Sequence, residues 1–188
     1  MAEQIDKAIS GGEKRMKGTV EHLEREFSGV RTGRATPALL DTIKVEYYGT
    51  TMPINQLATL SIPEPRLIVI APWDQGSIQA IERAIMTSDL GLTPHSDGKV
   101  IRLSIPALTE ERRKDLAKMV SKMAEEGKVK IRGIRRDVND ELEKLEKSSA
   151  ISEDELETAK KRVQHLTEQY IQQVDHVLER KVQEIMEE

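Results

Sequence analysis

The sequence predicts an α+β protein: an elongated, antiparallel three-helix bundle with a small β/α/β domain inserted after the first helix. Three observations predict this fold. Segments near both ends of the chain repeat apolar residues every three or four positions, as amphipathic helices do. A middle segment alternates apolar and polar residues, as half-buried strands do. Aromatic residues make up only 3% of the chain, so the core must be aliphatic, which favours helices packed on helices.

The first helix is indicated by apolar residues at alternating steps of four and three, namely Met16, Val20, Leu23, Phe27 and Val30. Ile5 and Ile9 extend this pattern toward the N-terminus. Gly11 and Gly12 interrupt it, and each costs about 1 kcal/mol relative to Ala inside a helix. We therefore expect the first turns to fray or bend.

The middle of the chain has the pattern of strands. Residues 41–47 alternate apolar and polar side chains, and residues 48–50 follow as a turn. Helical spacing returns over residues 77–86, with Asp74 or Ser77 as the expected N-cap. Further strands are predicted at residues 57–62, 67–70, 91–93 and 100–105.

Past Pro106 the chain returns to helical spacing. Thr109 is the expected N-cap of a helix that reaches Lys147, which would be about 58 Å long at about 1.5 Å per residue. Such a helix implies an elongated domain. Its apolar stripe comprises Leu116, Val120, Met123, Gly127, Ile131, Ile134, Val138, Leu142 and Leu145.

A third helix follows a break at residues 148–150. Ser152 and Glu155 are spaced as a capping box. The stripe of this helix comprises Leu156, Ala159, Val163, Leu166, Tyr170, Val174, Val177 and Ile185. Because a one-sided helix cannot bury its stripe alone, the three helices should pack together as an antiparallel bundle.

The predicted domains are therefore discontinuous in sequence. The bundle takes residues 1–30 and 106–188, and the inserted small domain takes residues 31–105. Two chain crossings connect them, and few contacts need to span such a junction. We expect a hinged, two-armed molecule whose hinge residues are Val30, Arg31, Thr32, Gly33, Arg34, Ile105, Pro106 and Ala107.

Composition excludes several classes of protein. The chain has 188 residues, a net charge of -4 and no cysteine, which excludes disulfides, thiolate nucleophiles and cysteine-ligated metals. No segment has the roughly 18 consecutive apolar residues of a membrane span, and residues 1–9 lack the apolar run of a signal peptide. We expect a cytoplasmic protein with no membrane partner.

One segment of the long predicted helix is strongly basic. Residues 128–136 carry five cations and no acid: Lys128, Lys130, Arg132, Arg135 and Arg136. Four of them, all except Lys130, fall within an arc of about 100° on a helical wheel. They form either a solvated face paired with acids such as Glu125 and Asp140, or a surface for RNA phosphates, which the planar guanidinium group of arginine fits.

The remaining motifs favour binding over catalysis. Arg31 lies where the first helix is expected to end, so it is either part of a C-terminal cap with Gly33 or an RNA contact. Adjacent residues such as His95, Ser96 and Asp97 rarely form a catalytic triad, and a turn needs the same residue types. The four histidines have no metal-ligand spacing, and no phosphate-binding glycine loop is present. We expect no catalytic residue, metal or cofactor, and expect Trp73 to be a packed anchor.

Five blocks, in one order along the chain, resemble the bacterial ribosome recycling factor family: RTGRA (31–35), VEYYGT (45–50), AIMTSDLGL (84–92), LTEERRKDL (108–116) and IRGIRRD (131–137). The resemblance implies an L-shaped monomer that binds the ribosome after termination. It further implies that elongation factor G acts with it to separate the subunits. The family's contact with large-subunit ribosomal RNA transfers to Arg132, Arg135 and Arg136, with Lys128 and Lys130 flanking, and to Arg31. A coiled-coil adaptor or chaperone is the alternative, and a small enzyme is the weaker one.

Overall fold

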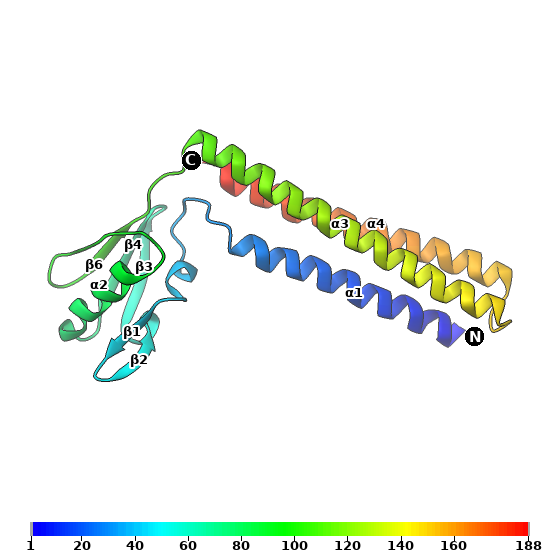
Figure 1. Ribbon diagram of the computed structural model, residues 1–188, viewed down its shortest axis with the longest axis horizontal. Helices are drawn as coiled ribbons and strands as arrows, with labels where there is room; N and C mark the ends of the chain where they lie inside the picture. The colour runs from blue at the N-terminus through cyan, green and yellow to red at the C-terminus, as the bar shows by residue number, and fades with distance from the viewer. Residues whose placement is uncertain (1, 188) are drawn as a thin grey trace. The chain divides into compact units, whose positions relative to one another are not determined.

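The computed structural model describes residues 2–187, which divide into two compact units. The second unit spans Thr32–Thr109 and contains the described strands and helix α2 (Ile78–Thr87). The α+β class predicted from the sequence is confirmed. The first unit is built from the helices α1 (Ala2–Ser28), α3 (Glu110–Lys147) and α4 (Glu153–Met186) (Figure 1).

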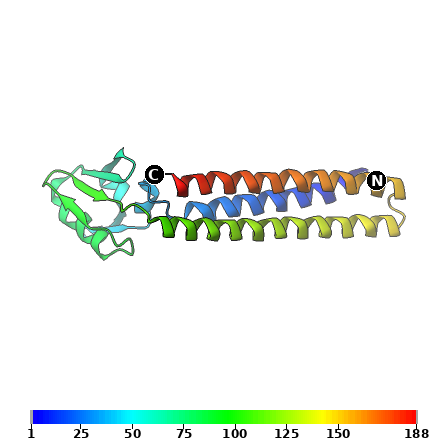
Figure 2. The ribbon, with the colours of Figure 1, turned by 90° about the horizontal axis from the view of Figure 1, so that it is seen from above.

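The first unit is an antiparallel three-helix bundle. Figure 2 shows α1 and α4 running in one direction and α3 in the other, and each helix contacts the other two. In α3 the buried stripe follows the predicted spacing, except that Ala124 is buried where Met123 was expected and Leu145 is only half-buried. The buried residues of α3 are Leu116, Val120, Ala124, Gly127, Ile131, Ile134, Val138 and Leu142.

Helix α1 contradicts the prediction that its first turns fray or bend. It is helical from Ala2 onward and passes through Gly11 and Gly12 without a break. Gly12 is buried, and a Cβ atom at this position would overlap the side chain of Val138 on α3. A close approach of α1 to α3 therefore accounts for a glycine at position 12, while position 11 faces open space.

Helix α4 begins with the predicted capping box. The backbone N–H of Glu155 donates to Ser152 Oγ at 3.1 Å, and the Ser152 N–H donates to Glu155 Oε2 at 2.8 Å. Two polar residues join the buried stripe where the sequence predicted only apolar ones. The hydroxyl of Thr167 donates to the Val163 carbonyl at 2.7 Å, and Lys181 keeps its ammonium 3.4 Å from Glu184.

The second unit contains two antiparallel sheets. A hairpin pairs β1 (Lys44–Tyr47) with β2 (Thr50–Pro53), and Tyr47 lies opposite Thr50. The other sheet has the strand order β3-β4-β6-β5. Its strands are β3 (Ala58–Glu64), β4 (Leu67–Pro72), β5 (Pro94–Ser96) and β6 (Ile101–Ser104).

Two strand predictions in this unit were wrong. Thr50 was placed in a turn, but it begins β2, whose exposed residues lack the alternation of a half-buried strand. The short strand predicted at residues 91–93 lies instead at Pro94–Ser96. This strand is at the edge of its sheet, where a proline without an N–H group is tolerated.

The start of α2 and the position of Trp73 also refine the predictions. Asp74 caps a short 3₁₀ turn, Gln75–Ser77, by accepting from the Gly76 N–H at 2.9 Å, and α2 follows directly. Trp73 was expected to be packed, but its side chain is 68% exposed. Its indole N–H donates to Thr59 Oγ1 at 2.9 Å, which holds the ring at the surface.

The core of the second unit is a single aliphatic cluster between the sheets and α2. Its members come from every strand except β2 and β5, from α2, and from the segments before β1 and between β2 and β3. The most completely buried of them are Leu40, Val45, Ile54, Ile68, Ile70, Ile81, Ile85, Ile101 and Leu103.

Candidate nucleic-acid interface

The basic segment lies near the middle of α3, where its five cations fall within about two and a half turns of helix. The sequence predicted that Lys128, Arg132, Arg135 and Arg136 would share one side of the helix. The structure divides the five cations of the segment among three directions instead, because the neighbouring helices α1 and α4 cover α3 on two sides.

Lys128 and Arg135 are directed at α4. Lys128 forms an ion pair with Asp175, and its side chain is only 18% exposed. The Arg135 Nη1 atom donates to Gln164 Oε1 at 3.1 Å. Both side chains therefore help to join α3 to α4, and neither presents all its donors to solvent.

Arg132 and Arg136 occupy the outward face of α3. The Arg132 side chain is 39% exposed and lies 3.3 Å from Glu125, one of the acids expected to pair with it. Arg136 is exposed, and within residues 2–187 it has no ion-pair partner. Val129 is 59% exposed on the same face. Arg136 thus has a full set of guanidinium donors available to an anion, and Arg132 has most of its own.

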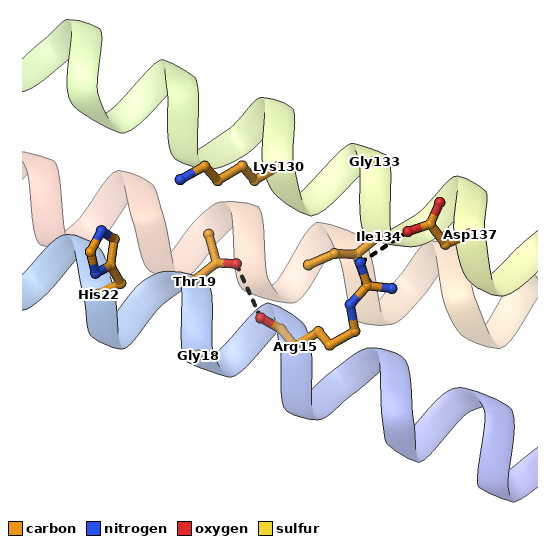
Figure 3. A pocket seen from close by; sticks show the side chains of 8 residues that line it. All are labelled: Arg15, Gly18, Thr19, His22, Lys130, Gly133, Ile134 and Asp137. Carbon is orange, nitrogen blue, oxygen red and sulfur yellow. Dashed lines mark hydrogen bonds and ion pairs between the residues drawn. The ribbon is translucent and has the colours of Figure 1, made fainter.

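Lys130 lines a groove between α1 and α3 (Figure 3). The groove has a volume of about 530 Å³. Gly18 and Gly133 line it, and a Cβ atom at either position would meet nothing within 4 Å. Its lining residues are Arg15, Gly18, Thr19, His22, Lys130, Gly133, Ile134 and Asp137.

The groove combines three basic side chains with one acid. Arg15 Nη2 on α1 lies 2.9 Å from Asp137 Oδ2 on α3, and this pair closes one end of the groove in Figure 3. His22 is exposed and lies 2.8 Å from Glu26. Sequence reasoning missed Arg15 and His22, because they lie on α1, more than 100 residues before Lys130. The local sequence of neither segment indicates that these side chains lie beside Lys130.

Arg31 lies outside the bundle's helical segments. Its side chain is exposed, and it follows the end of α1 at Ser28 by three residues. Gly33 has the expected left-handed backbone, with φ +78°. Because α1 ends at Ser28, Gly33 is too far along the chain to cap it, so the predicted role as a C-terminal cap is wrong.

The residues considered for catalysis have structural roles. The Asp97 carboxylate accepts from the Val100 and Lys99 N–H groups at 2.9 Å each and lies 3.0 Å from Arg102. These donors lower its pKa to about 2. Asp97 therefore orders the turn between β5 and β6 and does not orient a histidine.

Within residues 2–187, no three His, Cys, Asp or Glu side chains come close enough together to hold a metal ion. None of the described helices is both long and apolar enough to cross a bilayer.

Comparison with known proteins identifies the family. A family model described as ribosome recycling factor matches residues 23–186. The ribosome-recycling factor of Symbiobacterium thermophilum is 55% identical over 179 residues, which is 95% of this chain and 97% of the relative. That of Halalkalibacterium halodurans is 56% identical over 179 residues, again 95% of this chain and 97% of the relative.

Two solved structures agree with this result. The solution structure of a ribosome recycling factor is 44% identical and superimposes with a TM-score of 0.74, covering 97% of each chain. Another structure, titled as models of the T. thermophilus ribosome recycling factor and the E. coli elongation factor G bound to the E. coli post-termination complex, is 46% identical. It has a TM-score of 0.62 and covers 97% of this chain and 99% of the other. The chain therefore belongs to the ribosome recycling factor family.

Proposed function

We propose that this chain is a cytoplasmic translation factor that binds the ribosome after termination. Together with elongation factor G it separates the subunits, so that ribosomes are recycled from mRNA. The observation that carries the proposal is membership of the ribosome recycling factor family over nearly the whole chain. One family structure is titled as bound, with elongation factor G, to the post-termination complex. The chain acts as a monomer without catalytic chemistry of its own, and the energy comes from its partner.

The bundle docks on large-subunit ribosomal RNA through the outward face of α3. Arg136 and Arg132 make the phosphate contacts, because both lie on the outward face of α3 and their guanidinium groups match phosphate oxygens. Lys130 contributes from the groove beside α1. Lys128 and Arg135 hold α3 against α4 and add positive potential, and Arg31 adds a contact beyond the end of α1.

The second unit moves about the two chain crossings while the bundle stays docked. Two backbone hydrogen bonds mark where the chain joins this unit. The Ala35 N–H donates to the Pro65 carbonyl, and the Ile105 N–H donates to the Arg66 carbonyl. The hinge residues Val30 to Arg34, and Pro106 with Ala107, lie outside these two bonds. Each crossing is therefore a short run of chain able to absorb a change of backbone angle.

The experiment that tests the proposal measures binding to vacant ribosomes across a salt series. Phosphate contacts release counterions, so the affinity of the wild type should fall steeply with salt. The Arg132→Ala/Arg136→Ala variant should lose affinity and about one to two units of the salt slope. Lys161→Ala is the matched control, because Lys161 is an exposed cation on α4 that pairs with Glu157 at 3.3 Å.

Equal binding of the double variant and the wild type at every salt concentration would show that the outward face of α3 is only a solvated surface. A wild-type affinity that hardly changes with salt would instead favour a protein-binding adaptor. Failure of the wild type to separate subunits with elongation factor G and GTP would refute the proposed function itself.

A further inference from the structure

The turn between β5 and β6 depends on an Asp–Gly pair. The Asp97 carboxylate accepts from the backbone N–H groups of Lys99 and Val100 at 2.9 Å each, which closes the turn. Gly98 has φ +88°, a left-handed conformation that glycine adopts without strain. The geometry of the turn therefore favours this pair of residues, and Asp97 is the only aspartate in the chain that a glycine follows.

An Asp–Gly pair also isomerises more readily than other aspartyl pairs, because glycine has no side chain to hinder the reaction. The glycine nitrogen attacks Cγ of the aspartate, a water molecule leaves, and a succinimide ring forms. Water then opens the ring at either carbonyl. Opening at the former backbone carbonyl gives isoaspartate, whose main chain runs through Cγ. The product has the same atoms as the starting chain, so the reaction needs no oxidant, reductant or other reactant.

The folded turn keeps the two reacting groups apart, although residues 95–99 are exposed. The Gly98 N–H donates to Ser96 Oγ at 3.1 Å, so the attacking nitrogen is engaged with the preceding strand. The Asp97 carboxylate is engaged with the residues that follow, through its two backbone donors and through Arg102 Nη1 at 3.0 Å. These donors lower the pKa of Asp97 to about 2, and an ionised carboxylate resists attack by a nucleophile. Both groups must leave their hydrogen bonds before they can react.

We propose that Asp97 is a site of spontaneous isomerisation to isoaspartate, and that Ser96 and Arg102 suppress this reaction in the folded turn. The reaction proceeds from the opened turn, and β5 opens readily because it is a three-residue strand at the edge of its sheet. The extra main-chain carbon disturbs the pairing of β5 with β6, in which Ser96 faces Ile101. Isomerisation therefore loosens β5 from its sheet, and this inference is independent of the proposed function.

The experiment follows the formation of isoaspartate in the full-length chain at neutral pH. Trypsin releases residues 84–99 as one peptide, because cleavage follows Arg83 and Lys99. Chromatography separates the isoaspartyl form of this peptide, which has an unchanged mass, and fragmentation in a mass spectrometer assigns the isoaspartate to position 97. The same peptide contains an internal reference, since Asp89 is followed by Leu90, whose side chain hinders the attack.

Unfolding the wild type in guanidinium chloride should accelerate isomerisation at Asp97 by about tenfold or more, because every restraint of the turn is lost. In the folded chain, Ser96→Ala frees the Gly98 N–H and should accelerate the reaction by about two- to tenfold, the effect of one lost hydrogen bond. Ser96→Thr keeps the hydroxyl acceptor and should retain the wild-type rate. Arg102→Gln should accelerate the reaction by up to about fivefold, since an exposed ion pair is weak. Its matched control is Arg83→Gln, which changes an exposed cation on α2 and should have no effect.

Three results would overturn the proposal. The first is the absence of isoaspartate at position 97 even in the unfolded chain. The second is an equal rate of isomerisation in the folded and the unfolded wild type. The third is a Ser96→Ala chain that is folded, as judged by Trp73 fluorescence, and isomerises no faster than Ser96→Thr. If Ser96→Ala does not fold, the comparison of Arg102→Gln with Arg83→Gln replaces it, and equal rates in that pair overturn the proposal.

Discussion

The two units of the molecule are stabilised, and exposed to solvent, in different ways. The bundle spreads a narrow aliphatic stripe along three long helices and reinforces it with ion pairs between helices. The second unit gathers its aliphatic side chains in one compact cluster, and its outer surface carries exposed aromatic rings at Tyr48 and Trp73. The ion pairs between helices of the bundle are Arg15–Asp137, Lys128–Asp175, Lys160–Glu143, Arg162–Asp6 and Arg180–Glu24.

This difference suggests a division of labour. A surface dominated by long charged side chains suits a polyanion, whose affinity comes from charge. Exposed aromatic rings suit a protein partner, whose affinity comes from buried apolar area. The surface ion pairs themselves add little stability, since an exposed pair is worth about 0–1 kcal/mol. Charge in the bundle therefore contributes little to folding, which agrees with the proposed role of the bundle in binding RNA.

The largest expected effect on stability comes from creating a cavity in the core of each unit in turn. Ile70 on β4 and Ile131 on α3 are both fully buried, and each change to Ala should lower the free energy of unfolding by about 2–5 kcal/mol. Ile70→Ala should shift the unfolding transition seen by Trp73 fluorescence, because Trp73 lies in the same unit. Ile131→Ala should shift the helical circular dichroism signal. If each variant shifts both signals equally, the units unfold as one and the comparison breaks down.

A smaller effect sharpens the description of the bundle's packing. Gly12→Ala should lower the free energy of unfolding by about 1–3 kcal/mol, because the new methyl group would overlap Val138. Gly11→Ala is the matched control one residue away, where nothing lies within 4 Å. It should raise the free energy of unfolding by about 1 kcal/mol through helix propensity. Chemical denaturation of the two variants measures both changes, and equal effects would contradict the packing account.

The smallest effect concerns the second unit and pH. The pKa of Asp97 is about 2 in the folded chain, below its ordinary value of 3.8. The ionised carboxylate therefore stabilises the fold above about pH 4, and this contribution is lost as the pH falls toward 2. Asp97→Asn should be less stable than wild type at neutral pH, and the difference should shrink on acidification. Unfolding followed by Trp73 fluorescence at several pH values measures it, and a constant difference would contradict the assignment.

Long-period patterns made most of the bundle predictable. The stripes of α3 and α4 repeat often enough to define both helices, and the capping box at Ser152 marks the start of α4. The contacts between helices were not predictable in the same way. The burial of Gly12 depends on Val138, and the direction of Lys128 depends on Asp175. Such pairs lie far apart in sequence, so no local pattern reveals them.

The second unit was harder to predict because its strands are short. Strand β2 has two exposed residues followed by two half-buried ones and so gives no alternation, and β5 is a three-residue edge strand that starts with a proline. Among the candidate site residues, the sequence located the basic segment, but only the packing of α1 and α4 around α3 separates accessible from engaged cations. Tyr48 lies in one of the blocks that resemble the family, but the sequence pattern predicts neither its exposure nor its positive φ angle.

The insertion between α1 and α3 also orders events during synthesis of the chain itself. Arg15 meets Asp137 across 122 residues, and Asp6 meets Arg162 across 156, so α1 has no partner helices when it leaves the exit tunnel. The second unit is complete once Thr109 has been added, and it can fold while the rest of the chain is still being made. Until α3 and α4 emerge, the apolar stripe of α1 lacks the two helices that cover it. The nascent chain therefore exposes the apolar stripe of a helix for most of its translation. Chaperone binding would be most useful in this period.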